Sequence, residues 1–297
     1  MLPELRHGKD NAMKRIILVF LIFSLCLSGC GFLQKKPEES TSGTEDTFTV
    51  QQMDVEKGDM KIFGKLYIAK DAQGKMPAVI LSHSSDMTSD SMKSYCERIA
   101  GLGYVAYAFD FCGGSKNSRS DGKRADMTVF TEVDDLNAVL NTVRELDMVD
   151  GDQVFLFGTS QGGLVSALVA DERPADVRGL ILLYPGFNIA ELVQKFYHSG
   201  LKIPSNAFAD ALEDYDVYAH IGAFPGDVLI LHGSKDFLVP SAASEKAAAL
   251  YENCEFHLIE GANHGFNKEN YAVGDYDDVS WRYVEDYLTT HRPEATE

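Results

Sequence analysis

The chain has 297 residues, 45% of them hydrophobic, and a formal net charge of −18 at pH 7. This length and apolar content suffice for one large core, and no break in composition indicates two globular domains. So acidic a protein is not expected to bind nucleic acid, or to adhere to an anionic lipid surface through its own charge.

The N-terminal segment is organised like a bacterial signal peptide. Two basic residues, Lys14 and Arg15, precede an apolar run over residues 16–26. This run is too short to cross a bilayer as a mature helix, but it has the length of a signal-peptide core. We therefore predict that residues 1–29 are a cleaved signal peptide. A complete signal begins after residues 1–12, which are then an upstream extension.

The apolar run ends in Leu27–Cys30, which resembles a lipobox, the sequence at which bacterial lipoproteins are cleaved and lipidated. Cleavage before Cys30 would leave this cysteine to carry the lipid. An ordinary secretory signal or a short membrane anchor is the alternative. Residues 30–47 are mostly polar and are predicted to be a flexible tether. The folded part is thus expected outside the cytoplasm, attached to the cell membrane only through its lipid.

Three cysteines lie beyond this segment, at Cys96, Cys112 and Cys254. Their spacing fits neither a zinc site nor a redox pair, and the chemistry suggested below needs no cofactor, so no metal or other cofactor is predicted. We expect buried thiols, with at most one disulfide.

The rest of the chain alternates apolar strands with amphipathic helices. This alternation predicts a mostly parallel sheet with helices on both faces, in a domain over residues 48–291 with a tail at 292–297. The predicted elements are an antiparallel strand pair over 48–55 and 60–68, a strand over 76–81, a helix around 92–99, a strand over 104–109, a helix over 129–143, a strand over 154–159 followed by a helix over 164–169, strands over 180–184 and 228–231, a helix over 242–251, a strand over 255–259 and a closing helix around 281–288.

Residues 186–226 interrupt this alternation. A structureless loop of that length is unexpected inside a compact domain, and residues 189–199 have the apolar spacing of a helix. The segment is predicted to be a small cap over the functional site. A surface excursion without substrate contact is the alternative.

The stretch Gly158–Gly162 has the pattern Gly-x-Ser-x-Gly. The pattern alone occurs by chance in roughly one chain of this length in ten, so its context decides. Here it joins a buried strand to a buried helix, as in a nucleophile elbow, where the two glycines make room for a sharp turn. The turn is expected to expose the hydroxyl of Ser160.

A serine hydroxyl needs a base to take its proton. Asp236 lies just past the strand over 228–231, and His264 lies just past the last strand. The order Ser160, Asp236, His264 is that of the α/β-hydrolases. His264 would accept the proton of Ser160, and Asp236 would orient and stabilise the imidazole. Glu260 is the alternative acid, although it would have to fold back awkwardly onto His264.

An oxyanion formed on a substrate needs two amide donors. Gln161 N–H, directly after the nucleophile, is predicted to be one, and Ser85 N–H, in the loop after the strand over 76–81, the other. His83 is predicted to fasten this loop rather than to act in catalysis. Asp110 is predicted to organise the turn at the end of its strand.

From about Lys75 to Tyr287 the chain resembles bacterial α/β-hydrolases of the feruloyl (cinnamoyl) esterase-like group, together with their carboxylesterase and dipeptidyl-peptidase-like relatives. The resemblance implies the α/β-hydrolase fold, a serine carboxylesterase activity and an oxyanion amide from Gln161. The chain departs from this group at Ser84, where glycine is usual, and its cap is shorter than the insertion that clamps a phenolic acyl group. The matching stretches are Leu81–His83, Phe109–Ser115, Ser120–Gly122, Gly158–Gly163 and His232-Gly233 before Asp236.

We therefore expect a cell-surface hydrolase that cleaves small neutral carboxylic esters through an acyl-enzyme on Ser160, with an aromatic or short acyl or alcohol part. A serine exopeptidase or amidase on the same triad is one alternative, with Glu213 and Asp214 as candidate anchors for a substrate amino group. A binding lipoprotein that has lost catalysis is the other.

Overall fold

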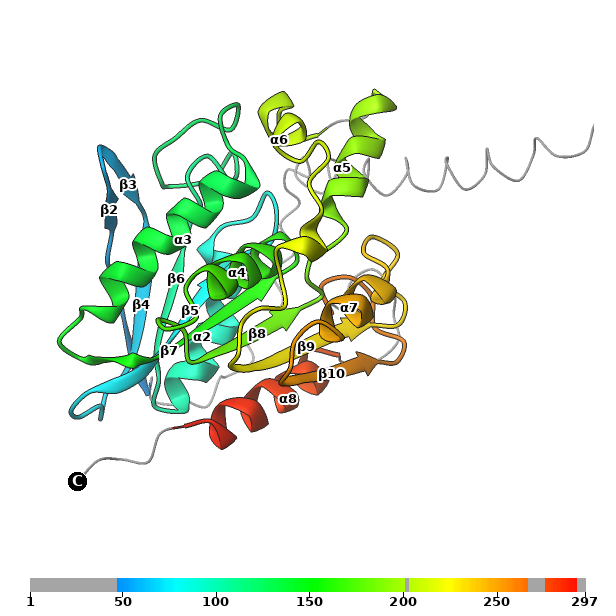
Figure 1. Cartoon of the computed structure of the whole chain (residues 1–297). Helices are drawn as coiled ribbons and strands as arrows, with labels where there is room; N and C mark the ends of the chain where they lie inside the picture. The colour runs from blue at the N-terminus through cyan, green and yellow to red at the C-terminus, as the bar shows by residue number, and fades with distance from the viewer. Residues whose placement is uncertain (1–46, 201–202, 267–275, 293–297) are drawn as a thin grey trace, which may run out of the picture. The chain divides into compact units, whose positions relative to one another are not determined.

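The computed structural model describes residues 47–200, 203–266 and 276–292 (Figure 1). The predicted signal peptide, Cys30 and the tether up to residue 46 lie outside the described residues, as do residues 293–297 of the predicted tail. Within the described ranges, no helix is both long enough and apolar enough to cross a membrane.

An eight-stranded sheet forms the centre of the domain. Its strands are β1 (Phe48–Gln52), β4 (Gly64–Ala69), β5 (Met76–Ser82), β6 (Val105–Phe109), β7 (Val149–Thr159), β8 (Gly179–Leu183), β9 (Asp227–Gly233) and β10 (Cys254–Ile259). Their order across the sheet is β1-β4-β6-β5-β7-β8-β9-β10. The pairs β1–β4 and β4–β6 are antiparallel, and every other neighbouring pair is parallel. The prediction of a mostly parallel sheet is confirmed.

The antiparallel pair predicted at the start of the domain is divided in two. Strands β2 (Val55–Lys57) and β3 (Met60–Ile62) form a small hairpin of their own, whereas β1 pairs with β4. The ladder is interrupted at Phe63, whose amide donates to Ser120 Oγ (2.8 Å) and whose carbonyl accepts from the amide of Asp110 (2.9 Å). The amide of Phe63 is therefore bonded to a distant loop, whereas its carbonyl is bonded to the residue that directly follows the neighbouring strand β6.

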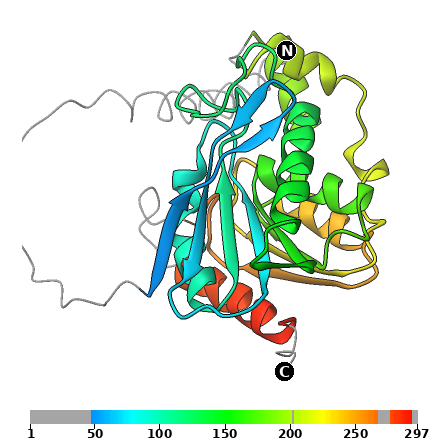
Figure 2. The same ribbon diagram turned by 90° about the vertical axis from the view of Figure 1, so that its left-hand side faces the viewer.

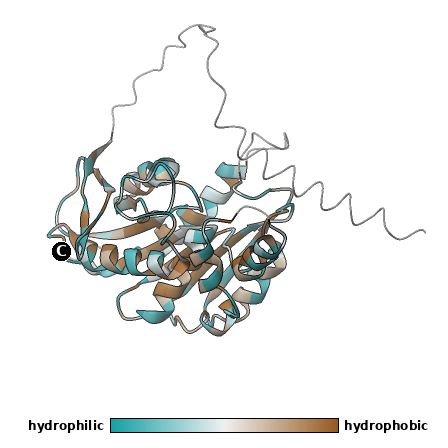
Figure 3. Ribbon diagram, turned by 90° about the horizontal axis from the view of Figure 1, so that it is seen from above, coloured by the Kyte–Doolittle hydropathy of each residue, from teal (hydrophilic) through white to brown (hydrophobic). Residues whose placement is uncertain are grey.

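Helices cover both faces of the sheet (Figure 2). They are α2 (Lys93–Gly101), α3 (Val129–Arg144), α4 (Gln161–Glu172), α7 (Ser241–Ala248) and α8 (Tyr276–Thr290). Side chains of α3, α4 and α7 share one apolar core, and those of α2 and α8 share the core on the other face. Successive strand residues point to opposite faces, so the central strands β5, β6 and β8, which are buried along their whole length, pack against helices on both sides; the central strands are brown in Figure 3.

The predicted cap region contains the helices α5 (Ile189–His198) and α6 (Asn206–Ala211) and the one-turn helix η2 (Val217–Ala219). Phe208 is fully buried and α6 packs against α5 and α3, so the segment is folded onto the domain rather than extended from it. Of the three cysteines, all unpaired, Cys96 and Cys112 are buried, whereas Cys254 is only partly buried.

Candidate active site

The sharp turn predicted around Ser160 lies between β7 and α4. Ser160 has φ 49° and ψ −117°, a conformation that is rare for a residue with a side chain and is found at nucleophile elbows. A Cβ atom at Gly158 would lie 2.3 Å from the carbonyl oxygen of Gly162, and one at Gly162 would lie 2.4 Å from that of Ser82. The chain can make this turn only because both positions are glycine.

The structure brings the three predicted residues Ser160, Asp236 and His264 together. The Nε2 atom of His264 lies 3.0 Å from Ser160 Oγ, and its Nδ1 atom lies 2.7 Å from Asp236 Oδ2. The Asp236 side chain is fully buried and that of His264 is 15% exposed. The carboxylate can only accept, so Nδ1–H donates to it and Nε2 is left to accept the Ser160 hydroxyl proton. Glu260, the alternative acid, is exposed.

The Asp236 carboxylate accepts hydrogen bonds from four N–H groups. The amides of Leu238 and Val239 each lie 2.9 Å from Oδ1. Oδ2 faces His264 and, at 3.1 Å, the Nε2 atom of a second histidine, His232. Burial by itself would raise the pKa of Asp236, but the hydrogen bonds from His232, His264 and the backbone hold it far below the ordinary value. Asp236 therefore stays ionised.

The two predicted oxyanion donors, Gln161 and Ser85, lie just past the carboxyl ends of strands β7 and β5. Gln161 is the first residue of α4, where helix amides have no intrahelical acceptor and the helix dipole is positive. Ser85 lies, partly exposed, in the loop between β5 and the one-turn helix η1 (Ser89–Met92). We refer to residues 83–89 below as the oxyanion loop.

His83 fastens the oxyanion loop, as predicted. Its Nδ1–H donates to the carbonyl of Ser84 (2.8 Å), and its Nε2 accepts from the amide of Phe111 (3.2 Å). Burial lowers the pKa of His83, which agrees with a neutral ring that donates once and accepts once.

The serine that replaces the usual glycine, Ser84, is also used to hold the loop. Its hydroxyl lies 2.9 Å from that of Thr159, and both interact with the phenol of Tyr184. Tyr184 has φ +39°, and its ring lies edge-on to that of His264 at 4.8 Å between centroids. Such a backbone costs of order 1–3 kcal/mol and persists where its surroundings require it. No sequence pattern had marked Tyr184.

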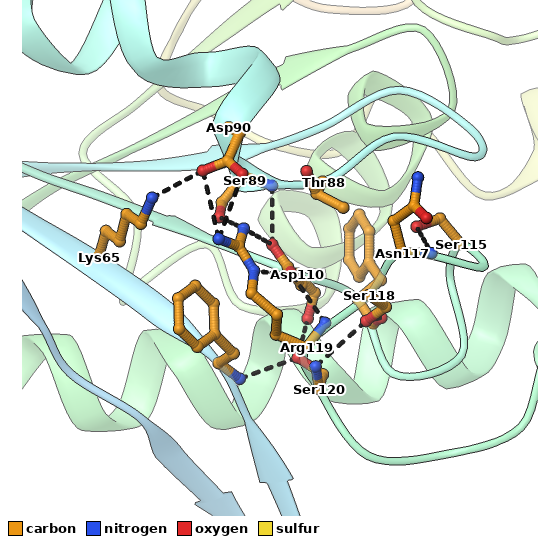
Figure 4. A network of polar contacts seen from close by, with 12 residues as sticks. Lys65, Thr88, Ser89, Asp90, Asp110, Ser115, Asn117, Ser118, Arg119 and Ser120 are labelled. Atoms are coloured by element: carbon orange, nitrogen blue, oxygen red, sulfur yellow. Dashed lines mark hydrogen bonds and ion pairs between the residues drawn. The ribbon is translucent and has the colours of Figure 1, made fainter. Parts of the chain in front are cut away.

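Asp110 and Arg119 tie a second loop to the oxyanion loop (Figure 4). Asp110 Oδ1 accepts from the amide of Ser89 (2.8 Å) and from Arg119 Nη2 (3.0 Å), and Oδ2 accepts from the Arg119 amide and Nε (2.9 Å each). Arg119 and Lys65 also pair with Asp90. The predicted turn-organising role of Asp110 is confirmed, and it extends to the loop that carries Ser85.

A buried acid that sequence reasoning missed lies behind Gln161. Glu132 is 1% exposed, and its Oε2 lies 2.6 Å from Gln161 Nε2. Burial raises the pKa of Glu132 to about 8. The signal in the sequence was a carboxylate three residues after Val129, on the apolar face of the helix predicted over 129–143.

The cap contains a cavity of about 330 Å³. Phe187, Tyr215 and Tyr218 supply aromatic walls, and Asp214 is one of its lining carboxylates, whereas Glu213 is not among them. Within the described ranges, no group of three or more His, Cys, Asp or Glu side chains is arranged to hold a metal ion.

Comparison with known proteins gives a matching family model and similar solved structures. Residues 75–217, a little under half of the chain, match the family model described as "Serine aminopeptidase, S33". This range contains Ser85 and Ser160 but ends before Asp236 and His264. The solved structure of ferulic acid bound to Est1E from Butyrivibrio proteoclasticus has a TM-score of 0.71 and 24% identity, covering 80% of this chain and 98% of that one.

Two curated relatives extend the comparison. An uncharacterised protein of Mycobacterium tuberculosis is 25% identical over 211 residues, which are 71% of this chain and 70% of that protein. The human monoglyceride lipase is 28% identical over 114 residues, which are 36% of this chain and 34% of the lipase.

Proposed function

The chain has the α/β-hydrolase fold, and from this fold and the geometry of the site we propose that it hydrolyses carboxylic esters through an acyl-enzyme on Ser160. The observation that carries the proposal is the line of contacts from Ser160 Oγ to His264 Nε2 (3.0 Å) and from His264 Nδ1 to Asp236 Oδ2 (2.7 Å). A histidine base held by a buried carboxylate in this way makes a serine hydroxyl nucleophilic.

The proposed reaction has two halves. In the first, Ser160 Oγ attacks the ester carbonyl carbon while its proton moves to His264 Nε2, and the oxyanion accepts hydrogen bonds from the amides of Gln161 and Ser85. The carbon–oxygen bond to the alcohol then breaks, and His264 returns the proton to the leaving alkoxide. In the second half, water repeats the attack on the acyl-enzyme and releases the acid.

The proposed substrate is a small neutral ester with an aromatic or short acyl or alcohol part. The cap cavity is lined by Phe187, Tyr215 and Tyr218 but not by the triad itself. Phe187 directly follows Gly186, which lies against the backbone of Ser160, and an aromatic wall there supports an apolar or aromatic group on one side of the ester. Likeness to Est1E, whose solved structure holds ferulic acid, supports the same class. The lipobox-like Leu27–Cys30 supports a location at the outer face of the cell membrane.

A serine exopeptidase or amidase is the second candidate. The matching family description names an aminopeptidase, and Asp214 lines the cap cavity together with Glu191 and Asp216. Carboxylates there could hold a substrate amino group. Rates on p-nitrophenyl acetate and on aminoacyl p-nitroanilides separate the two: kcat/KM higher on the anilides would favour the exopeptidase.

The test of catalysis is Ser160→Ala measured against p-nitrophenyl esters. Ser160→Ala should keep the fold and lose turnover, because it removes the hydroxyl that is hydrogen-bonded to His264 Nε2. Ser166→Ala, in the same helix α4 and fully buried, is the matched control and should keep turnover. Undiminished turnover in Ser160→Ala would overturn the proposal, and a folded parent protein without turnover would favour the binding lipoprotein.

A further inference from the structure

A second buried histidine contacts the Asp236 carboxylate. His232 lies near the end of β9, on the same face as Val228 and Ile230, and this face is covered by α7. Its side chain is fully buried. Nδ1 lies 2.7 Å from the hydroxyl of Ser244 in α7.

The partners of the other ring nitrogen, Nε2, show that this atom carries a hydrogen. His232 Nε2 lies 2.9 Å from the carbonyl oxygen of Val239 and 3.1 Å from Asp236 Oδ2. Both partners only accept hydrogen bonds, so Nε2 carries a hydrogen and shares it between them. Ser244 can serve Nδ1 either as donor or as acceptor, so this conclusion does not depend on the charge of the ring.

We propose that His232 is a positioning residue for the reaction: through its Nε2–H it fixes the Asp236 carboxylate in the orientation that His264 requires. The inference rests on the proposed function of the Ser160 site. Among the described residues, no hydrogen bond joins His232 to Ser160 or to His264, so its effect passes through Asp236.

The bond from His232 holds the second carboxylate oxygen of Asp236, Oδ2. The amides of Leu238 and Val239 hold Oδ1, but the loop backbone leaves Oδ2 to the side chains. Without His232, His264 would be the one remaining group bonded to Oδ2 among the described residues. The carboxylate could then rotate about its Cβ–Cγ bond and move the imidazole away from Ser160, and small displacements of a catalytic group are costly in rate.

The bond from His232 to Asp236 also affects how strongly the carboxylate attracts the proton of His264. An N–H group directed at Oδ2 stabilises the carboxylate and so weakens its pull on the proton of His264. When this N–H is removed, the carboxylate loses that stabilisation and attracts a protonated imidazole more strongly. In the described part of the chain, His264 and His232 are the titratable side chains bonded to Asp236, and the phenol ring of Tyr184 lies against the ring of His264.

The test compares three substitutions of His232 in the full chain, with p-nitrophenyl acetate as substrate. His232→Phe keeps the ring shape without a donor, and His232→Asn keeps a polar amide that is too short to reach Oδ2. Either should lower kcat by ~10- to 100-fold with little change in KM, since a hydrogen bond to a charged group is lost. The acid limb of the kcat/KM profile should move to higher pH.

His232→Gln is long enough to present an amide N–H to Oδ2 and should recover most of the lost kcat. His257→Phe is the matched control: His257 lies on the neighbouring strand β10, paired with Leu231 and bonded to Glu255, and its loss should leave turnover unchanged. Thermal unfolding of each variant checks that it is folded. If His232→Phe does not fold, the Asn and Gln variants carry the comparison.

Parent-like kcat and an unmoved acid limb in folded His232→Phe or His232→Asn would overturn the inference alone. The same reduction in kcat in the Gln and Asn variants, with no shift of the acid limb, would also overturn it, because that pattern is typical of a packing defect. A folded parent protein without turnover would overturn the proposed function and this inference with it.

Discussion

Replacing the acid of the site by its amide, Asp236→Asn, is expected to reverse the hydrogen-bond direction of His264. The amides of Leu238 and Val239 donate to Oδ1, so the carbonyl oxygen of the new Asn takes that place. Its NH₂ group then faces His264 Nδ1, where Oδ2 now lies 2.7 Å away. Because NH₂ donates, Nδ1 must accept, and the ring hydrogen moves to Nε2, which faces Ser160.

The expected loss follows from this change of tautomer. A hydrogen on Nε2 prevents His264 from taking the proton of Ser160, and a comparable substitution in a Ser-His-Asp triad lowers kcat by on the order of 10⁴. The fold should be kept, because Asn has the shape of Asp and two of the four hydrogen bonds remain. KM should change much less than kcat, since Asp236 does not contact substrate in the proposed reaction.

The assay is steady-state turnover of p-nitrophenyl acetate, with circular dichroism and thermal unfolding to check the fold. Glu260→Gln is the matched control, because Glu260 was the alternative acid and is exposed. It should leave kcat within a few-fold of the parent, as expected for a solvated side chain away from the reacting atoms. A loss under ~10-fold in folded Asp236→Asn, or a larger loss in Glu260→Gln, would refute the assignment of the acid.

Three further predictions test other parts of the account. Glu132→Gln should gain stability relative to the parent as the pH rises from 4.5 to about 8. Burial raises the pKa of folded Glu132 from 4.5 to about 8, so the parent is the less stable the more its unfolded state ionises across that window. A difference in Tm that does not change with pH would contradict this. Arg119→Ala should lower kcat by ~10-fold, because Asp110 and the hydroxyl of Ser89, the last residue of the oxyanion loop, both lose their guanidinium partner, whereas Arg98→Ala, which breaks an exposed pair, should not. Cys30→Ala should move the protein from the membrane fraction to the medium or periplasm when it is expressed in bacteria, and unchanged membrane recovery would exclude the lipid anchor.

The sheet, the elbow and the order of the triad could be predicted because each depends on local chemistry. Gly158 and Gly162 are required by contacts within a few residues of Ser160 or with the adjacent strand. Asp236 and His264 follow parallel strands, whose carboxyl ends meet at one edge of the sheet. A pattern of apolar strands therefore locates them without any knowledge of their contacts.

The remaining parts of the site depend on contacts between distant segments. Tyr184 reaches His264 across 80 positions of the chain, and Glu132 reaches Gln161 across 29. Neither partner is marked by local spacing, so no periodicity could reveal them. The split of the first strand pair has the same origin, because Ser120 binds the Phe63 amide from 57 residues away.

The central claim is that His264 activates the hydroxyl of Ser160, and labelling with a fluorophosphonate tests it most directly. The native protein should be modified once, at Ser160, as mapped by mass spectrometry of its peptides, and His264→Ala should abolish the reaction while Ser166→Ala leaves it intact. A folded native protein that is not labelled, or is labelled at another serine, would contradict the account.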